Sequence, residues 1–324
     1  MRAVYYEDFG TADVLKIGQR PCPEPAADEV LVQVGAAGVN PIDRRLRNGE
    51  LQDFFKRQWP IVPGWDVAGR IVKTGSNVTG WKAGDDIVGL AFTWTLQHGT
   101  YAEFVPVKAA SIAHKPAELS FDEAAALPLV SLTAWESLAE YAELGAGQTV
   151  LIQAGAGGLG SVAIPIAKHL GAVVYTTTRK QNFDYVRGRG ADHPIDYTQS
   201  DYVEVIRARE PDGVDVVLES LTGDDIVEAA IRVVKTGGTV VYMNNEPPEM
   251  PDIAERNIRS KFLHHRPDGE SLARLMQLYR TGALPLPCIE VLPLESAAEA
   301  HRRSESRGTR GKLVLHVQEI RDPV

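Results

Sequence analysis

The chain is poor in cysteine, in long apolar runs and in positive charge. Its 324 residues include only two cysteines, Cys22 and Cys288, which excludes a disulfide framework and a four-cysteine zinc site. No stretch approaches the roughly 18 apolar residues that a membrane span needs, and the first residues lack the apolar core of a signal peptide. Lysine and arginine total 34 against 43 for aspartate and glutamate, so the net charge of -9 argues against nucleic acid as a partner. We therefore expect a protein of the reducing cytoplasm with no membrane partner.

The first third of the chain has the pattern of a β-rich domain. Residues 29–35, 67–74 and 86–90 alternate as strands do, and glycine and proline interrupt the chain closely around them. Short strands broken by turns at this spacing are typical of an antiparallel barrel or a coiled sheet.

From about residue 120 the pattern changes to alternating helices and strands. A helical pattern over residues 122–143 is interrupted at Pro128, and residues 149–154 form a nearly continuous apolar run, typical of a strand buried on both faces. Further strands are predicted at residues 172–178, 193–196, 214–219, 239–243 and 261–265, with helices at 158–170 and 225–234. About six parallel strands with crossover helices indicate an α/β, doubly wound parallel sheet of the Rossmann type.

The last part of the chain returns to a strand. Residues 269–279 are predicted as a helix and residues 310–317 as a strand. A lone strand at the end must pair with another, and the β-rich first third offers the partner. We therefore predict a nucleotide-binding domain at residues 122–266, inserted into a β-rich domain made of residues 1–121 and 267–324.

A glycine-rich loop follows the apolar strand at residues 149–154. It reads Gly155-Ala156-Gly157-Gly158-Leu159-Gly160 and opens an apolar helix, which matches the G-x-G-x-x-G pattern. The glycines allow a tight turn and let backbone amides approach a pyrophosphate at the positive end of the helix. The loop predicts a dinucleotide site. A glycine turn that serves only close packing of the helix on the strand is the alternative interpretation of the same sequence.

The residues after the second strand of this domain bear on the choice of dinucleotide. NAD-binding proteins usually place an acidic residue there, whereas this chain has Thr178, Arg179 and Lys180 and no acid before Asp184. Hydroxyls and two cations suit a ribose 2′-phosphate, so NADPH (NADP) is favoured over NAD. The alternative is that the two cations only begin a solvated helix.

Several short motifs occur in a fixed order along almost the whole chain. They are residues 36–43 (AAGVNPID), 63–69 (PGWDVAG), 99–104 (GTYAEF), 124–128 (AAALP), 132–135 (LTAW) and 307–315 (RGTRGKLVL). With these motifs the chain resembles the zinc-independent quinone oxidoreductase (ζ-crystallin-like) branch of the medium-chain dehydrogenase/reductase superfamily. The resemblance implies a GroES-like catalytic domain built from both chain ends around a central Rossmann domain, and a homodimer.

The same resemblance bears on metal content. Zinc alcohol dehydrogenases of the superfamily hold catalytic zinc at positions that correspond here to Asn40 and Trp65, and an indole cannot ligate zinc. His98, His114 and His169 are isolated in the sequence. We therefore predict no metal site.

Without a metal Lewis acid, the implied reaction is hydride transfer from NADPH to a quinone or an α,β-unsaturated carbonyl. The protein is then needed to position two planar partners and to donate hydrogen bonds to the carbonyl oxygen. An enoyl-thioester reductase, and a non-catalytic NADPH-binding protein of the crystallin or RNA-binding kind, stay open as alternatives.

The resemblance assigns roles to individual residues. Asn40 is implied to face the nicotinamide and the substrate, and Thr133 to contact the nicotinamide side. For both there is a structural alternative: an asparagine turn before Pro41, and a helix hydroxyl bonded to its own backbone. Asp43 and Arg47 fit a structural ion pair on one helical face.

Four further residues are expected at the cofactor. Lys180, Tyr197 and Arg307 correspond to contacts with the 2′-phosphate, and Asn244 is expected beneath the cofactor, after the fifth strand. Tyr197 fits a packing role equally. No tyrosine follows the Arg-x-Gly of the first motif, so the sequence identifies no phenolic proton donor there. Five aromatic residues fit either an apolar substrate pocket or the core: Phe54, Phe55, Trp59, Phe92 and Trp94.

Overall fold

The computed structural model describes residues 1–263, 266–306 and 308–320. The chain divides into two compact units. The first unit comprises Met1–Leu132, Arg266–Gly282 and Leu286–Val324, and the second comprises Thr133–His265 and Ala283–Pro285. Residues 122–132 therefore fall in the first unit, whereas the sequence pattern placed them with the nucleotide-binding domain.

The first unit is built on a seven-stranded sheet with strand β3 (Glu29–Val39) near its centre. The strand order is β16-β17-β3-β5-β6-β9, and β8 pairs with β3 beyond this path. The other members are β5 (Asp66–Thr74), β6 (Asp86–Leu90), β8 (Phe104–Lys108), β9 (Ile112–His114), β16 (Ile289–Pro293) and β17 (Lys312–His316). Two small sheets pair β1 (Arg2–Tyr5) with β2 (Lys16–Gln19), and β4 (Lys56–Arg57) with β7 (Thr95–Leu96).

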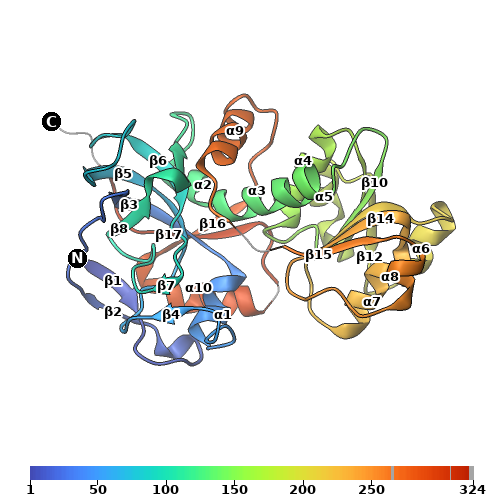
Figure 1. Ribbon diagram of the computed structural model, residues 1–324, viewed down its shortest axis with the longest axis horizontal. Helices are drawn as coiled ribbons and strands as arrows, with labels where there is room; N and C mark the ends of the chain where they lie inside the picture. The colour runs from blue at the N-terminus through green and yellow to red at the C-terminus, as the bar shows by residue number, and fades with distance from the viewer. Residues whose placement is uncertain (264–265, 307, 321–324) are drawn as a thin grey trace. The chain divides into compact units, whose positions relative to one another are not determined.

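The predicted pairing of the last strand with the N-terminal region is confirmed. Strand β17 runs antiparallel to β3, with Leu313 opposite Val39 and Leu315 opposite Ala37. Figure 1 shows this C-terminal strand among the N-terminal strands of the same unit. The two ends of the chain therefore build one sheet.

Five helices complete the first unit or begin there. They are α1 (Pro41–Arg47), α2 (Phe121–Ala125), α3 (Pro128–Trp135), α9 (Gly269–Arg280) and α10 (Ala297–Glu305). The predicted break at Pro128 is confirmed, because α2 ends at Ala125 and the proline begins α3, where its missing N–H costs nothing. α2 packs closely on β3, since a Cβ at Gly38 would lie 2.4 Å from the Ala125 carbonyl oxygen.

The second unit is a six-stranded parallel sheet in the order β12-β11-β10-β13-β14-β15. Its strands are β10 (Thr149–Ile152), β11 (Val173–Thr178), β12 (His193–Asp196), β13 (Val214–Glu219), β14 (Val234–Tyr242) and β15 (Arg259–Phe262). The crossover helices are α4 (Gly160–His169), α5 (Phe183–Gly188), α6 (Tyr202–Arg209), α7 (Asp224–Val233) and α8 (Pro251–Glu255). The doubly wound α/β prediction is confirmed, and the order reverses between β10 and β13, which makes that edge the expected ligand crevice.

The strands of this sheet follow the predicted apolar runs. In β13 only Asp215 is less than fully buried, and its carboxylate accepts from Thr149 N at 2.9 Å, which ties β13 to β10. The predicted strand at residues 261–265 is observed as Arg259–Phe262, and residues 264–265 lie outside the described part. Within the residues described, no helix is long and apolar enough to span a bilayer.

Candidate functional site

The glycine-rich loop joins β10 to α4, as the sequence predicts. A Cβ at Gly155 would lie 2.0 Å from Thr176 Oγ1, and one at Gly160 would lie 2.5 Å from Gly155 Cα. Glycine at both positions therefore lets the loop press onto β11 and lets α4 begin directly against the loop. Without side chains at these glycines, a ligand can come close to the backbone amides of the turn. The turn lies at the positive end of the ten-residue helix α4, an arrangement that fits the pyrophosphate of a dinucleotide.

The loops after β10 and β13 are joined at the point where the strand order reverses. Ser220 Oγ donates to the Gln153 carbonyl oxygen at 3.3 Å, and Gln153 Nε2 donates to Tyr202 Oη at 3.2 Å. Gln153 is buried and directly precedes Ala154, whose φ of 51° starts the glycine turn. Sequence reasoning missed Gln153 and Ser220, although both directly follow strands at the switch point, which is the signal that identifies them.

Two of the residues predicted at the cofactor, Arg179 after β11 and Tyr197 after β12, are in contact, and their role at a cofactor stays a prediction. Arg179 Nε donates to the Tyr197 hydroxyl at 3.1 Å, and Lys180 follows Arg179 on the exposed surface. Tyr197 is 50% exposed, so its ring is not a core residue. Thr178 lies beside them, buried, with its hydroxyl accepting from Asn182 Nδ2 at 3.4 Å. The group presents two cations and a phenol, which suits a phosphate monoester.

Asp196 directly precedes Tyr197, and its carboxylate is already engaged by neighbouring groups. It accepts from Thr198 Oγ1 at 2.7 Å and from Thr198 N at 3.0 Å, and these bonds hold the pKa of Asp196 below its usual range. Among the residues described, no ion pair joins Arg179 to a carboxylate. The guanidinium is therefore available to an anionic ligand.

Asn244 follows β14 and binds the loop after the neighbouring strand β13. Its Nδ2 donates to the Ser220 carbonyl oxygen at 2.7 Å, and Asn245 Nδ2 donates to the Leu221 carbonyl oxygen at 2.9 Å. Glu219, at the end of β13, accepts from Leu221 N at 2.6 Å and is fully buried, which raises the pKa of its carboxyl to about 7. Asn244 thus supports the crevice edge, and its contact with the cofactor stays a prediction.

Thr133 lies buried in α3, at 4% exposure. Its carbonyl oxygen accepts from Ser137 Oγ at 2.6 Å, one helical turn later. The role of Thr133 beside the nicotinamide stays a prediction.

Asn40 lies in the first unit at the end of β3, inside a buried polar network. Its Nδ2 donates to Asp66 Oδ2 at 2.7 Å, and its Oδ1 accepts from the ammonium of Lys312. Lys312 also donates to the Val39 carbonyl oxygen at 3.1 Å and lies 3.5 Å from Asp66 Oδ2. These bonds fix both ends of the carboxamide. Asn40 is 1% exposed, and its contact with substrate stays a prediction.

The charges of this network are compensated within it. Burial raises the pKa of Asp66, which the Lys312 cation opposes, and burial lowers the pKa of Lys312. The other carboxylate oxygen of Asp66 accepts from Leu129 N at 2.8 Å, at the start of α3. A buried pair of this kind holds its shape because neither charge can leave without stranding the other.

A second buried carboxylate, Asp43, adjoins the network at the start of α1. It accepts from Asn40 N at 2.8 Å and from the Tyr101 hydroxyl at 3.1 Å, and burial raises its pKa to about 7. Tyr101 is fully buried, so its phenol lies beside Asp43 in the interior of the first unit.

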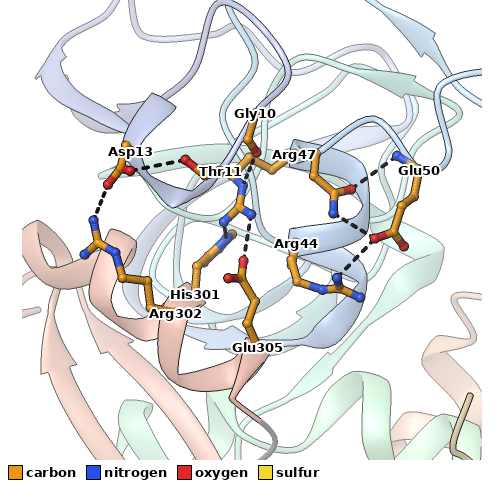
Figure 2. Close-up of polar contacts among 10 residues, drawn as sticks. Gly10, Thr11, Asp13, Arg44, Arg47, Glu50, His301, Arg302 and Glu305 are labelled. Carbon is orange, nitrogen blue, oxygen red and sulfur yellow. Dashed lines mark hydrogen bonds and ion pairs between the residues drawn. The ribbon is translucent and has the colours of Figure 1, made fainter.

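The predicted Asp43–Arg47 pair is wrong. Figure 2 shows Arg47 of α1 reaching Gly10, His301 and Glu305 instead. Its Nε donates to the Gly10 carbonyl oxygen at 3.0 Å, Nη1 to His301 Nδ1 at 3.1 Å and Nη2 to Glu305 at 2.7 Å. Burial and the Arg47 charge lower the pKa of His301 to about 3, so the imidazole is neutral and accepts from the arginine. Arg47 therefore joins α1 to α10 and has a structural role.

The residues at the corresponding zinc positions do not fit a zinc ion. Trp65 is buried and carries no ligating atom, and Asp66 is committed to Asn40, Leu129 and Lys312. In the part of the chain that the structure describes, no group of three or more His, Cys, Asp or Glu side chains could hold a metal ion.

Four of the five aromatic candidates lie in two separate clusters. Phe55, Phe92 and Trp94 pack with Trp65, whereas Trp59 contacts Tyr6 and Phe9. Phe54 is 69% exposed. The remaining cofactor candidate, Arg307, lies outside the described residues.

Comparison with known proteins gives consistent matches to both units. Residues 26–117 match the alcohol dehydrogenase GroES-like domain, and residues 189–315 match the zinc-binding dehydrogenase family. The chain is 35% identical to the 2-methylene-furan-3-one reductase of Solanum lycopersicum, covering 98% of this chain and 79% of that protein. It is 33% identical, with the same coverage, to the chloroplastic NADPH-dependent alkenal/one oxidoreductase of Arabidopsis thaliana.

A solved structure agrees with these matches. The Escherichia coli quinone oxidoreductase complexed with NADPH is 27% identical and superposes with a TM-score of 0.89, covering 98% of this chain and all of that one. Both the GroES-like and the Rossmann predictions are confirmed. With relatives of this identity matched over almost its whole length, the chain belongs to the quinone oxidoreductase branch of the medium-chain dehydrogenase/reductase superfamily.

Proposed function

We propose that this protein is an NADPH-dependent reductase that transfers hydride to a quinone or an α,β-unsaturated carbonyl compound without using zinc. The observation that carries the proposal is the group at the end of β11, where Arg179 meets Tyr197 beside Lys180 and next to the glycine-rich loop. The named activities of the relatives, on alkenals, enones and quinones, support it.

The second unit supplies the cofactor site. The backbone of the loop at residues 155–160 would hold the pyrophosphate, and Arg179, Lys180 and Tyr197 would hold the 2′-phosphate by charge-assisted hydrogen bonds. When bound, the reduced nicotinamide supplies the hydride. We expect the site to bind NADPH more tightly than NADH, because NADH has no 2′-phosphate and leaves the two cations in contact with water.

The first unit supplies the carboxamide of Asn40 as the candidate donor for the substrate oxygen. Asp66 accepts a hydrogen bond from one N–H of the Asn40 carboxamide, and Lys312 donates one to the carboxamide oxygen. The second N–H of Asn40 Nδ2 is then the donor for the substrate oxygen, which gains negative charge as hydride arrives at the conjugated carbon. Because the amide cannot rotate without breaking two buried bonds, this donor costs little reorganisation.

The test is a steady-state assay that follows NADPH consumption with a quinone, an acyclic enal and an enoyl thioester, repeated with NADH. We expect turnover of the quinone or the enal, and a clear preference for NADPH. Turnover confined to the enoyl thioester would establish the enoyl reductase instead. Tight NADPH binding without turnover of any of the three would establish a binding protein. Cytoplasmic location and a homodimer are further proposals, checked by fractionation and by sedimentation.

A further inference from the structure

The buried polar network of the first unit contains two carboxyl groups and one ammonium group, so its charges do not balance when all three are ionised. We propose that this network holds one extra proton at neutral pH, that the proton resides on the side chain of Asp43, and that the neutral Asp43 is a positioning residue that lets Asn40 stabilise negative charge on the substrate oxygen. The proposal rests on the proposed function, because it concerns the Asn40 donor of that reaction.

The three ionisable side chains of the network have almost no contact with water. Asp43 and Asp66 are fully buried, and Lys312 is 2% exposed. If all three were ionised, the network would carry one net negative charge with no solvent to stabilise it. Two carboxyl groups that share a buried site with a single cation do not both ionise, so one of them keeps a proton.

The hydrogen bonds indicate which carboxyl group keeps this proton. Asp66 accepts bonds on both of its oxygens, from Leu129 N and from Asn40 Nδ2. Its Oδ2 also lies 3.5 Å from Lys312 Nζ. Asp43 accepts bonds on Oδ2 alone, and among the described residues no group donates to its Oδ1. A buried carboxylate with one unbonded oxygen costs more free energy than the neutral acid, so Asp66 is the ionised group and Asp43 the protonated one.

The neighbouring cation, Arg47, is already compensated by other groups. It lies on the same helix α1 as Asp43 and is 2% exposed, and its Nη2 pairs with Glu305 of α10 at 2.7 Å. Its Nη1 binds the imidazole of His301, and burial lowers the pKa of that imidazole to about 3, so His301 brings no positive charge. Asp43 therefore gains no ion-pair partner from α1 or α10.

The two tyrosines that act on Asp43 are neutral as well. Tyr101 donates to Asp43 Oδ2 at 3.1 Å, Tyr6 is also close enough to sense the Asp43 charge, and burial raises the pKa of both phenols. Burial raises the pKa of Asp43 itself to about 7, which agrees with the hydrogen bonds. The proton is therefore held below neutral pH and is lost as the pH rises through about 7.

This proton matters because Asp43 is bonded to the residue that carries the donor. Asn40 N donates to Asp43 Oδ2 at 2.8 Å, which places the carboxyl group beside the backbone of Asn40. An ionised Asp43 adds an uncompensated negative charge near the substrate oxygen as that oxygen becomes negative, and such charges repel strongly in a buried site. The neutral acid keeps the bond to Asn40 N without this repulsion. Asp43 thus acts through Asn40, and its proton is not transferred.

The location of the proton is tested without any reaction. Infrared spectra of the protein with isotope-labelled aspartate are recorded as the pH is raised, and the carbonyl band of a protonated aspartate should disappear through about pH 7. Asp43→Asn should abolish this band. Asp28→Asn is the matched control, because it removes a surface carboxylate that pairs with Lys108, and it should leave the band unchanged. Tyr101→Phe should move the transition to higher pH, because it removes a bond that favours the ionised form.

The effect on the reaction is measured as the single-turnover rate of hydride transfer at saturating NADPH. In the wild type this rate should fall about tenfold from about pH 6 to about pH 8. In Asp43→Asn the rate should not depend on pH over this interval, because the carboxamide still accepts from Asn40 N but cannot ionise. Asp28→Asn should follow the wild type.

Three results overturn the proposal. A protonated-aspartate band that persists in Asp43→Asn assigns the proton to Asp66, and a wild type without this band at about pH 6 has no such proton. A rate that falls equally with pH in the wild type and in Asp43→Asn excludes the positioning role. If Asp43→Asn does not fold, an unchanged infrared transition in Tyr101→Phe overturns the proposal in its place. The expected infrared transition without turnover of any substrate contradicts the proposed function and leaves the proton on Asp43 established.

Discussion

Two cations, one in each unit, have opposite environments. In the first unit, Lys312 is 2% exposed and binds Asn40, Val39 and Asp66. In the second unit, Arg179 lies at the surface and binds only the neutral hydroxyl of Tyr197 among the residues described. A buried cation must be satisfied inside the protein and therefore fixes the groups around it, whereas an exposed cation can exchange water for a ligand phosphate. The difference separates a positioning role from a binding role.

The largest expected effect tests the buried side of this contrast. Lys312→Met leaves Asp66 without its cation, and we expect a loss of about 3–5 kcal/mol in the free energy of unfolding. The measurement is chemical denaturation at neutral pH. Lys108→Met is the control, because Lys108 pairs with Asp28 at the surface and should cost at most about 1 kcal/mol. Similar losses of unfolding free energy in the two variants would contradict the distinct roles assigned to the buried and the exposed cation.

The next effect concerns a buried carboxylate of the second unit. Burial raises the pKa of Glu219 from 4.5 to about 7, so the native state holds this proton more tightly than the unfolded chain does. The stabilisation from this group is therefore complete below pH 4.5 and is lost as the pH rises through about 7. Relative to Glu219→Gln, the wild type should lose on the order of 3 kcal/mol over this interval.

Denaturation curves at several pH values check this prediction. Glu204→Gln, on the exposed face of α6, should follow the wild type throughout. A constant difference in stability between wild type and Glu219→Gln across the interval would mean that Glu219 is ionised in the native state.

A smaller effect tests the exposed side of the contrast. Arg179→Ala removes charge-assisted hydrogen bonds to the 2′-phosphate, and we expect the Kd for NADPH to rise about 10- to 100-fold with that for NADH unchanged. Titration of cofactor fluorescence measures both constants. Arg187→Ala, an exposed arginine on α5 that lies over the Phe183 ring, should change neither. Equal weakening of NADPH and NADH binding would exclude Arg179 from phosphate recognition.

The smallest effect refines the role of Tyr197. Tyr197→Phe removes the hydroxyl that accepts from Arg179 Nε while keeping the ring, so NADPH affinity should fall about two- to threefold. The same titration measures it. An effect as large as that of Arg179→Ala would show that the phenol itself carries the phosphate contact.

Much of the fold could be predicted from local patterns in the sequence. Parallel strands buried on both faces appear as apolar runs, such as 214–219, and the structure has β13 at those residues. The glycine-rich loop was predictable because its glycines are required by the backbone geometry of the turn. The contact between Arg179 and Tyr197 follows from the pairing of β11 with β12, because adjacent parallel strands end at the same edge of the sheet. The two-residue pairing of β4 with β7 was not predictable, since neither segment carries a strand pattern.

The site of the first unit shows where sequence reasoning ends. Asp43 and Arg47 stand one helical turn apart and suggest a pair, yet tertiary packing gives each a different partner. The helical spacing was correct, but His301 and Glu305 of α10 bind the Arg47 guanidinium through two of its nitrogens, whereas Asp43 binds Asn40 N and Tyr101.

The sequence by itself determined the alternation of strands and helices, the phosphate-binding turn and the absence of an acid after β11. These features depend on residues within one or two elements, where periodicity and backbone geometry are local. Only the tertiary structure decided that Asn40, Asp66 and Lys312 form one network, because Asn40 lies 26 residues from Asp66 and 272 from Lys312. The raised pKa of Asp66 and the lowered pKa of Lys312 have the same origin, since burial is a property of the folded chain and not of any segment of it.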